Sequence, residues 1–431
     1  MLSKNITVAD NGNLEFAGYN TVELAKKYST PLYLMDENLI RERMREYKTA
    51  LSDFFSVESV PEYASKAFSC KRIYEIAKEE GINVDVVSIG ELYTAYKAGF
   101  PLSNCFFHGN SKIDAEIEFA IKHGIGFIVI DNIEEISTIN SLAEKYDVIQ
   151  KVIIRVTPGI DPHTHKKIST GSVESKFGIS LETGDIFTAV ETVLNCKNIE
   201  LYGFHCHIGS QIFESEPFVT VAKIMVSFLV EVRAKYGYVT KYLNLGGGFG
   251  VKYVENDPEI NYRKRIEEVS IKIKNLCEKE NFPLPNILME PGRSLVADAG
   301  MTLYTVNNVK EIKNYTNYVS IDGGMTDNPR YALYESKYTV YNATRAGDEP
   351  DYIATIAGRC CESGDLIQEN VKIKKPIKGD IIAVAATGAY NYSMASNYNR
   401  VARPPVVMLS DDGDYLAVKR ESLEDLIKLD I

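Results

Sequence analysis

The stretch LYGFHCHIGS, residues 201–210, joins an apolar and aromatic run to a polar, glycine-containing continuation. This change of character is typical of a buried β-strand that ends at a loop. Seven other runs between about residues 55 and 292 show it, and stretches with apolar residues three and four apart, typical of amphipathic helices, separate them. The eight predicted strands lie at 59–65, 84–88, 105–109, 126–131, 151–156, 201–208, 242–247 and 286–291.

Eight strands that alternate with helices indicate a closed (β/α)8 barrel of the TIM type. In such barrels the functional residues lie at the C-terminal ends of the strands, where the following loops surround one mouth. The positions just past the eight runs are mostly polar or glycine, which agrees with this expectation. They are Lys66, Ser88, His108 to Asn110, Asp131, Asn132, Arg155, His207 to Ser210, Gly246 to Gly248 and Glu290 to Arg293.

After residue 297 the sequence changes to closely spaced strand-like runs, which predict an all-β domain with a final helix over 422–430. The opening stretch, up to LYLMD at 32–36, is also strand-like, and we expect it to join this domain. We therefore predict a barrel over 37–296 and a discontinuous β domain, like a sandwich or a barrel, from 1–36 and 297–431. Its main strands are expected at 301–309, 318–322, 338–344, 352–358, 380–386, 404–409 and 414–419.

The composition argues against several classes of partner. The formal net charge is -11 and no basic run is dense, so we expect no nucleic acid partner. No apolar run reaches membrane-spanning length, and the N-terminus lacks the features of a signal or transit peptide, which favours the cytoplasm and no membrane. The seven cysteines show no CxxC spacing, which favours buried, reduced thiols over disulfides or a zinc cage, including for the adjacent Cys360 and Cys361.

Two features of the predicted mouth have both a structural and a functional interpretation. Lys66 could be an extended surface side chain, or a desolvated amine suited to form a Schiff base. The glycines 246–248 could form a plain tight turn, or let backbone N–H groups approach a phosphate after strands seven and eight. Ser210 and Arg293 could add donors to such a phosphate site.

The histidines of HCHIGS could bind a metal or stack on a flat ligand. His205 and His207 are two apart, a spacing that can bind a metal if further ligands such as His108 or Asp131 contribute. We favour stacking and predict no metal, because no metal signature recurs. Glu290 could be a solvated acid, or a carboxylate that keeps a heterocycle nitrogen protonated. The lysine, phosphate cradle, imidazole and acid together indicate pyridoxal 5'-phosphate (PLP).

Several longer motifs resemble one family, the PLP-dependent decarboxylases with an alanine-racemase-like barrel (fold type III), and within it the diaminopimelate decarboxylases. The resemblance runs along nearly the whole chain. The motifs are YASKA (63–67), DVVSIGEL (85–92), FHGNSK (107–112), TPGIDPHTH with STG and SKFGI (157–179), HCHIGSQI (205–212), GGGFG (246–250), EPGRS (290–294), IDGGMTD (321–327), CESGD (361–365) and GAYNYSMASNYN (388–399).

The resemblance implies a role for each of these positions in cofactor binding. Lys66 would bind PLP covalently, His207 would stack on its ring, and Glu290 would pair with the pyridine nitrogen. The implied surroundings of the phosphate or its approach are Ser210, Gly246, Gly247, Gly248, Pro291, Gly292, Arg293 and Tyr390.

The resemblance also implies how the substrate is bound and protonated. Arg293, Arg330, Tyr334 and Tyr390 would surround the substrate and its far carboxylate, although Pro329 and Tyr331 around Arg330 depart from the family's Arg-Pro-x-Leu-Tyr. Glu362 would accept the far ammonium. Cys361 would return a proton after CO2 leaves, whereas Cys360 would only pack.

The implied reaction is decarboxylation of meso-2,6-diaminopimelate to L-lysine, the last step of lysine biosynthesis, in a homodimer whose subunits share active sites. Alternatives on the same fold are a decarboxylase of carboxynorspermidine, ornithine or arginine, a racemase, and a non-catalytic regulator. Glu362, where ornithine decarboxylases usually have Asp, favours meso-diaminopimelate. A substrate without the far carboxylate would leave two arginines unpaired, which is costly.

Overall fold

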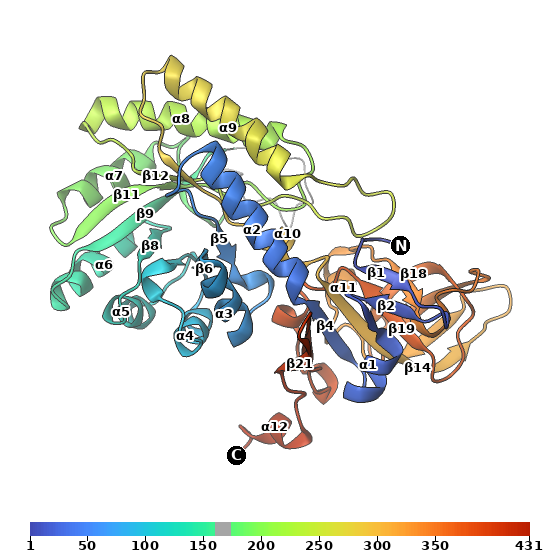
Figure 1. The fold of residues 1–431 in the computed structure, drawn as a ribbon. Coiled ribbons are helices and arrows are strands. Elements are labelled where there is room, and N and C mark those ends of the chain that lie inside the picture. Colours follow the sequence, from blue (N-terminus) through green and yellow to red (C-terminus); the bar gives the residue numbers. More distant parts are fainter. Residues whose placement is uncertain (160–173) are drawn as a thin grey trace. The chain divides into compact units, whose positions relative to one another are not determined.

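The structure, a computed structural model, describes residues 1–159 and 174–431 (Figure 1). The chain forms two compact units: a barrel unit of Arg43–Gly250 and Ile260–Gly292, and a β unit of Met1–Glu42, Val251–Glu259 and Arg293–Ile431. The domain limits predicted from the sequence, 37–296 for the barrel, stay a prediction. Most of the motif TPGIDPHTH with STG lies outside the described residues.

Within the described residues, eight parallel strands of the barrel unit form one sheet in the order β13-β12-β11-β9-β8-β7-β6-β5, and β10 pairs with β9. The Glu62 N–H donates to the Met289 carbonyl (2.8 Å) and the Ala64 N–H to that of Pro291 (3.1 Å), so the two edges meet. The predicted eight-stranded barrel is therefore confirmed. The strands are β5 Glu62–Ala64, β6 Asn83–Val86, β7 Cys105–Phe107, β8 Phe127–Ile130, β9 Gln150–Thr157, β10 Ile179–Ser180, β11 Ile199–His205, β12 Tyr242–Asn244 and β13 Asn286–Leu288.

The helices of this unit begin and end at recognisable signals. For example, α3 buries Ile73 and Ile76 on one face and ends at Gly81, whose left-handed backbone (φ 65°) suits glycine. The Ser88 side chain accepts a hydrogen bond from the Glu91 N–H and caps α4. The helices are α3 Lys71–Glu80, α4 Ile89–Lys97, α5 Asp114–Lys122, α6 Glu134–Lys145, α7 Asp185–Asn195, α8 Glu216–Tyr236 and α9 Tyr262–Lys279.

The β unit contains, within the described residues, a nine-stranded sheet and a small sheet of β1, β2 and β3. The long strand β14 pairs with β4, β19 and β15 along its length, so it links the parts of the larger sheet. The predicted β character is confirmed, and one strand, β18, was not predicted. The strands are β1 Ile6–Val8, β2 Leu14–Phe16, β3 Tyr19–Asn20, β4 Leu32–Asp36, β14 Gly300–Lys310, β15 Tyr318–Ile321, β16 Val340–Asn342, β17 Tyr352–Ala357, β18 Leu366–Ile373, β19 Ile381–Ala385, β20 Val406–Ser410 and β21 Gly413–Val418.

Four short helices also belong to the β unit, and a longer one, α2 Glu37–Phe54, starts in it and continues into the barrel unit. The four are α1 Thr21–Tyr28, α10 Arg293–Val296, α11 Arg330–Tyr334 and α12 Leu423–Ile427, the last capped by Ser422 as predicted.

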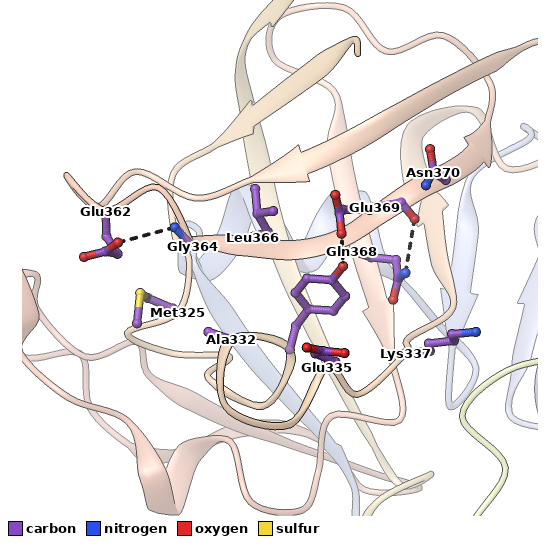
Figure 2. Close-up of a pocket in the computed structure, with 11 residues that line it drawn as sticks. Met325, Ala332, Glu335, Lys337, Glu362, Gly364, Leu366, Gln368, Glu369 and Asn370 are labelled. Atoms are coloured by element: carbon purple, nitrogen blue, oxygen red, sulfur yellow. Dashed lines mark hydrogen bonds between the residues drawn. The ribbon is translucent and has the colours of Figure 1, made fainter. Parts of the chain in front are cut away.

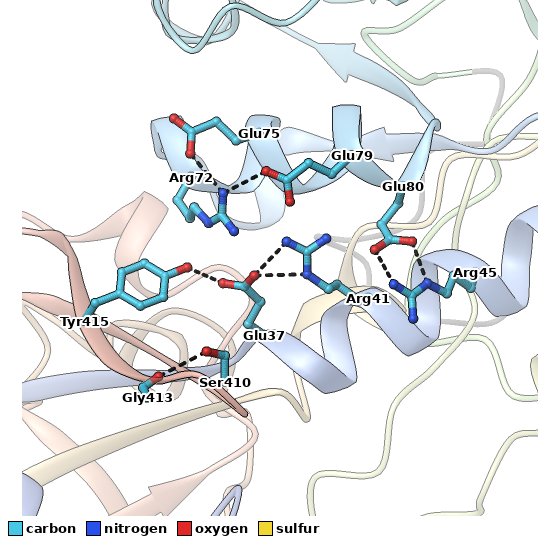
Figure 3. A network of polar contacts seen from close by, with 10 residues as sticks. All are labelled: Glu37, Arg41, Arg45, Arg72, Glu75, Glu79, Glu80, Ser410, Gly413 and Tyr415. Carbon is cyan, nitrogen blue, oxygen red and sulfur yellow. Dashed lines mark hydrogen bonds and ion pairs between the residues drawn. The ribbon is translucent and has the colours of Figure 1, made fainter.

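Ion pairs fix helix α2 within each unit separately (Figure 3). In the β unit, Glu37 accepts hydrogen bonds from Arg41 (Nη2 to Oε1, 2.7 Å) and from the Tyr415 hydroxyl of β21. In the barrel unit, the Arg45 guanidinium binds both carboxylate oxygens of Glu80, at 2.6 and 2.7 Å. A bidentate ion pair of this kind restrains the orientation of both side chains more than a single contact does.

All seven cysteines lie in the described residues and are free thiols, as predicted. Across those residues, no helix is both long and apolar enough to cross a bilayer.

Candidate active site

Lys66 lies in a short 3₁₀ turn, Ser65–Ala67, directly after β5 and so at the C-terminal end of the first barrel strand. Its side chain is 40% exposed, and its Nζ lies 3.8 Å from Oδ2 of Asp85, which is 1% exposed. Burial raises the pKa of Asp85 to about 8, although the Lys66 charge acts to lower it. Asp85 is therefore a buried acid beside the predicted reactive amine, and it was not singled out from the sequence.

Glu290 is buried just past β13 and belongs to a group that we call the carboxyl cluster: Glu62, His108, His205, Asn244 and Glu290. Its Oε1 accepts a hydrogen bond from Asn244 Nδ2 (2.9 Å), and the ring nitrogens His205 Nε2 and His108 Nε2 lie 3.0 and 3.3 Å away. Burial alone would raise the pKa of Glu290, but His205, His108 and Lys66 outweigh it and hold that pKa well below its ordinary value. The structure therefore keeps a carboxylate charged at the end of strand eight.

Three side chains of this cluster bring potential metal-ligating atoms within 4.8 Å of one another, the one such group in the described part of the chain: His108, His205 and Glu290. The metal alternative considered from the sequence paired His205 with His207, which is not in this group. We interpret the three as an electrostatic group, because Oε1 of Glu290 already accepts a hydrogen bond from Asn244 and has the ring nitrogens of His205 and His108 within 3.3 Å. Burial lowers the pKa of both His108 and His205, although the Glu290 carboxylate acts to raise it.

The glycines 246–248 follow β12 and cannot be replaced without a clash. A Cβ on Gly246 would lie 2.6 Å from the Cys206 carbonyl oxygen, and one on Gly247 would lie 2.1 Å from that of Glu290. The Ile212 N–H donates to the Gly248 carbonyl (2.9 Å), which brings the loop that carries Ser210 beside the glycines. The backbone in this loop is therefore free of side chains where a phosphate would approach.

His207 lies past the end of β11 and next to the glycine loop, since a Cβ on Gly246 would lie 2.7 Å from its Nδ1. Burial lowers the pKa of His207 to about 3, with a further contribution from the Lys66 charge. A neutral imidazole is suited to stack on a flat ring. His205 and His207 thus have different surroundings, although they are two residues apart.

Pro291 and Gly292 pack against β5. The Pro291 carbonyl accepts the Ala64 N–H, and a Cβ on Gly292 would lie 3.0 Å from that of Ala64. This close approach places the EPG segment beside the strand that leads to Lys66.

The β unit brings the two predicted substrate arginines together on a tyrosine that the sequence did not reveal, Tyr253. Nη1 of Arg293 donates to the Tyr253 hydroxyl (2.7 Å), and the Arg330 guanidinium lies 4.8 Å from the Tyr253 ring. Burial would raise the pKa of Tyr253, but the two guanidiniums outweigh burial and lower it. Two cations on one buried ring form a site suited to an anion.

Tyr390 and Tyr334 were both predicted to lie near these arginines. The Tyr390 ring lies 4.8 Å from the Arg293 guanidinium, and its backbone is left-handed (φ 59°), which is uncommon for a bulky residue. Tyr334 ends α11 and is half-buried. The hydroxyl that receives Arg330 Nη1 is that of Tyr338, at 3.1 Å, a residue not predicted for the site.

The CESGD loop presents one cysteine and buries the other. Cys361 is exposed, whereas burial raises the pKa of the Cys360 thiol to about 11. The Asp365 carboxylate accepts the backbone N–H groups of Cys360 and Met325, both at 2.6 Å, and so fixes the loop. The distinction drawn between the two thiols from the sequence therefore agrees with their exposure.

Glu362 is exposed and lines a cavity of about 890 Å³ in the β unit (Figure 2). Two further carboxylates, Glu335 and Glu369, line the same cavity beside a single Lys337. This face of the β unit is therefore acidic, which suits a cationic group.

The barrel unit fits PLP on several independent grounds. It has an accessible amine on Lys66, a glycine loop in which a Cβ would meet backbone, and a neutral imidazole on His207. The charged Glu290 carboxylate has its contacts with the described residues concentrated on Oε1, which leaves Oε2 for a donor such as a pyridinium nitrogen. The donor set therefore agrees with the cofactor predicted from the sequence.

Comparisons with known proteins give the same picture. Residues 37–297 match the family model described as "Pyridoxal-dependent decarboxylase, pyridoxal binding domain". The diaminopimelate decarboxylase of Bacillus subtilis is 46% identical over 98% of this chain and 96% of its own. Two solved structures, diaminopimelate decarboxylases of M. jannaschii and Helicobacter pylori in complex with L-lysine, match with TM-scores of 0.92 and 0.86. Their identities are 35% and 32%, and they cover 100% and 95% of this chain and 99% of each of theirs.

Proposed function

We propose, from the premise that this chain belongs to the pyridoxal-dependent decarboxylases, that it converts meso-2,6-diaminopimelate to L-lysine and CO2 with PLP as cofactor. The reaction would be the last step of lysine biosynthesis. The observation that carries the proposal is the placement of the Lys66 amine and the charged, buried Glu290 at C-terminal strand ends of one barrel unit. A lysine that attaches PLP and an acid for its ring nitrogen are the two groups that this chemistry needs most.

When bound, PLP supplies an electron sink for the electron pair that CO2 leaves behind. The residues of this chain hold the cofactor and control protons around it. Lys66 would attach it covalently, with Asp85, 3.8 Å from Nζ, able to exchange a proton with the amine when it is released. Glu290 would keep the pyridine nitrogen protonated, and His207 would hold the ring flat. The N–H groups of residues 246–248, with Ser210, Arg293 and Tyr390, would bind the phosphate or line its approach.

Cys361 is the residue that we assign to deliver a proton to the carbon that loses CO2. Its thiol is exposed on the β unit, and its N–H donates to Asn399 Oδ1 at 2.7 Å, which holds the backbone at this position. A thiol is suited to general acid catalysis near neutral pH. Cys360 is buried, with its pKa raised to about 11, which suits this role less well than the exposed Cys361.

Specificity would come from the two ends of the substrate. Arg293 and Arg330 would bind the far carboxylate, with Tyr334 and Tyr390 beside them, and Glu362 would accept the far ammonium. The sharing of Tyr253 by both guanidiniums supports this assignment, because it concentrates positive charge in one buried place. Ornithine and lysine lack the far carboxylate and would leave this charge unpaired.

We further propose a homodimer in the cytoplasm, in which the CESGD loop of each subunit completes the site of the other. The support is that Cys361 and Glu362 are exposed on the β unit while Asp365 holds their backbone in place. An exposed proton donor needs a partner surface to exclude water during the reaction.

Purified protein, supplied with PLP and meso-diaminopimelate, should release L-lysine and CO2 in equal amounts. Ornithine, arginine, carboxynorspermidine and L-lysine should each react at least roughly a hundredfold more slowly, since each leaves buried charges unpaired. Faster turnover of any of these four would contradict the assigned substrate. Racemised diaminopimelate without CO2 would indicate a racemase, and cofactor binding without any reaction would indicate a regulator.

A further inference from the structure

Glu62 is a fully buried carboxyl on β5 that none of the steps above uses. Its Oε1 accepts a hydrogen bond from Asn244 Nδ2 at 2.9 Å, and the same nitrogen donates to Glu290 Oε1 at 2.9 Å. The Asn244 orientation is fixed, because its Oδ1 accepts the Gly246 N–H at 2.8 Å and a backbone N–H can only donate. One amide group therefore joins two buried carboxyls, with one hydrogen for each.

The carboxyls of Glu290 and Glu62 differ in the polar atoms that surround them. Oε1 of Glu290 also has two imidazole nitrogens close to it, His205 Nε2 at 3.0 Å and His108 Nε2 at 3.3 Å. Oε2 of Glu62 makes no hydrogen bond to any residue in the described ranges, and His108 Nε2 lies 3.5 Å from it. Because two imidazoles lie within 3.3 Å of Glu290 and one lies 3.5 Å from Glu62, the negative charge is more stable on Glu290 than on Glu62.

The charges that face Glu62 do not favour its ionisation. Glu290 and the buried Asp85 are the two acids that repel a charge on it, and Asn244 is its one hydrogen-bond donor among the described residues. The Lys66 amine lies 3.8 Å from Asp85, and burial lowers the pKa of His108 well below its ordinary value, which disfavours a positive charge beside Glu62. Two adjacent carboxyls in the protein interior do not both ionise readily without a cation between them.

We propose that Glu62 is a positioning residue that retains its proton at neutral pH, and so leaves a single negative charge in the carboxyl cluster, on Glu290. Burial first, and then Glu290 and Asp85, raise the pKa of Glu62 well above its ordinary value, which supports the proposal. The inference about function rests on the proposed role of Glu290 toward the pyridine nitrogen. Because Asn244 joins the two carboxyls, a protonated Glu62 would leave the negative charge on Glu290.

Infrared spectra of the PLP-loaded protein labelled with 13C-carboxyl glutamate test this directly, because protonated and ionised carboxyls absorb at different frequencies and only the glutamate bands shift with the label. At pH 7 the wild type should show a protonated-carboxyl band that shifts with the label, and Glu62→Gln should lose it. Glu62→Asp keeps a carboxyl at this position, but aspartate does not carry the label, so this variant should also lose the labelled band. It replaces Glu62→Gln in the test if that variant does not fold. The surface variant Glu200→Gln, which removes an ion pair with Lys241, should keep the band. A wild type without a labelled band, or a band unchanged in the Glu62 variants, would overturn the proposal.

Activity with PLP gives a second readout, which fails separately if the proposed reaction is wrong. Near pH 6.5, Glu62→Gln should have a kcat within about threefold of wild type, because Gln keeps a neutral oxygen for Asn244. As pH rises, the wild type should lose activity when Glu62 ionises. Glu62→Gln has no carboxyl at this position to ionise, so the ratio of its kcat to that of the wild type should increase. A ratio that stays constant with pH would contradict the role in catalysis, while the infrared result stands whatever substrate the protein uses.

Discussion

The carboxyl cluster of the barrel unit and the CESGD loop of the β unit both carry groups predicted to act on the substrate, in opposite surroundings. Glu290 and Glu62 are 5% and 0% exposed and are bound by Asn244 in the same unit. Cys361 and Glu362 are exposed, and the contacts that fix their loop are made by its backbone. The side chains of the barrel group contact one another, whereas Cys361 and Glu362 of the loop are exposed on the β unit.

This difference separates two tasks. Keeping a heterocycle nitrogen protonated requires a fixed negative charge in the protein interior, where each hydrogen bond has a large effect. Delivering a proton and choosing a substrate need groups that meet the substrate only when it is bound. The predictions below alter one region or the other, in order of decreasing effect.

The largest effect is expected from the barrel. Lys66→Ala removes the amine that attaches the cofactor, so turnover of meso-diaminopimelate should fall by roughly 10³-fold or more. The visible absorbance of the protein-bound cofactor should change at the same time. The surface variant Lys241→Ala should keep both. Substantial activity in Lys66→Ala, with normal absorbance, would show that the attachment site lies elsewhere.

The two adjacent cysteines should respond unequally. Cys361→Ala should lower kcat by roughly 10²-fold or more, because a positioned proton donor contributes on that scale, while the cofactor stays bound. Cys360→Ala is the matched control and should change kcat by less than about twofold, with a stability cost of about 1 kcal/mol. Equal losses in both variants would mean that the loop, not one thiol, is responsible.

The barrel could be predicted because its strands end in glycine or polar residues that repeat along the chain, and Lys66 and Glu290 were found at such ends. The carboxyl cluster was less visible. His108 and His205 were noted as possible metal ligands. They meet Glu290 only because their side chains point to the inside of the barrel, and the sequence did not show which face of each strand points inward. Glu62 and Asn244 gave no signal, since a single polar residue in a strand is read as exposed unless its partners are known.

The β unit was predicted less completely. Strand β18, LIQENVKI, was missed because its apolar periodicity breaks at Glu369 and Asn370, both exposed, where Asn370 has a positive φ of 53°. Tyr253 was missed because it lies in Val251–Glu259, a segment that belongs to the β unit although barrel residues flank it in sequence. Only the folded chain brings it to Arg293 and Arg330, 40 and 77 positions away.

A smaller effect is expected from Tyr253→Phe, which removes the hydroxyl that accepts from Arg293 but keeps the ring under Arg330. The KM for meso-diaminopimelate should increase roughly tenfold, with kcat affected less, because hydrogen bonds to charged groups contribute about 1.5–3 kcal/mol. Tyr341→Phe removes another tyrosine hydroxyl of the β unit, one that binds the Leu2 N–H, and should leave KM unchanged. An effect on kcat alone would argue against a role in substrate binding.

The shared site is the central claim, and mixed dimers test it most directly. Lys66→Ala chains and Cys361→Ala chains, each strongly impaired alone, are exchanged at random, and the rate of L-lysine formation is measured together with the fraction of mixed dimers. If the loop of one subunit serves the barrel of the other, each mixed dimer has one intact site, and about a quarter of the wild-type sites should return by two-fold symmetry. No recovery in dimers shown to be mixed would contradict the shared site and place both residues in one chain's own site.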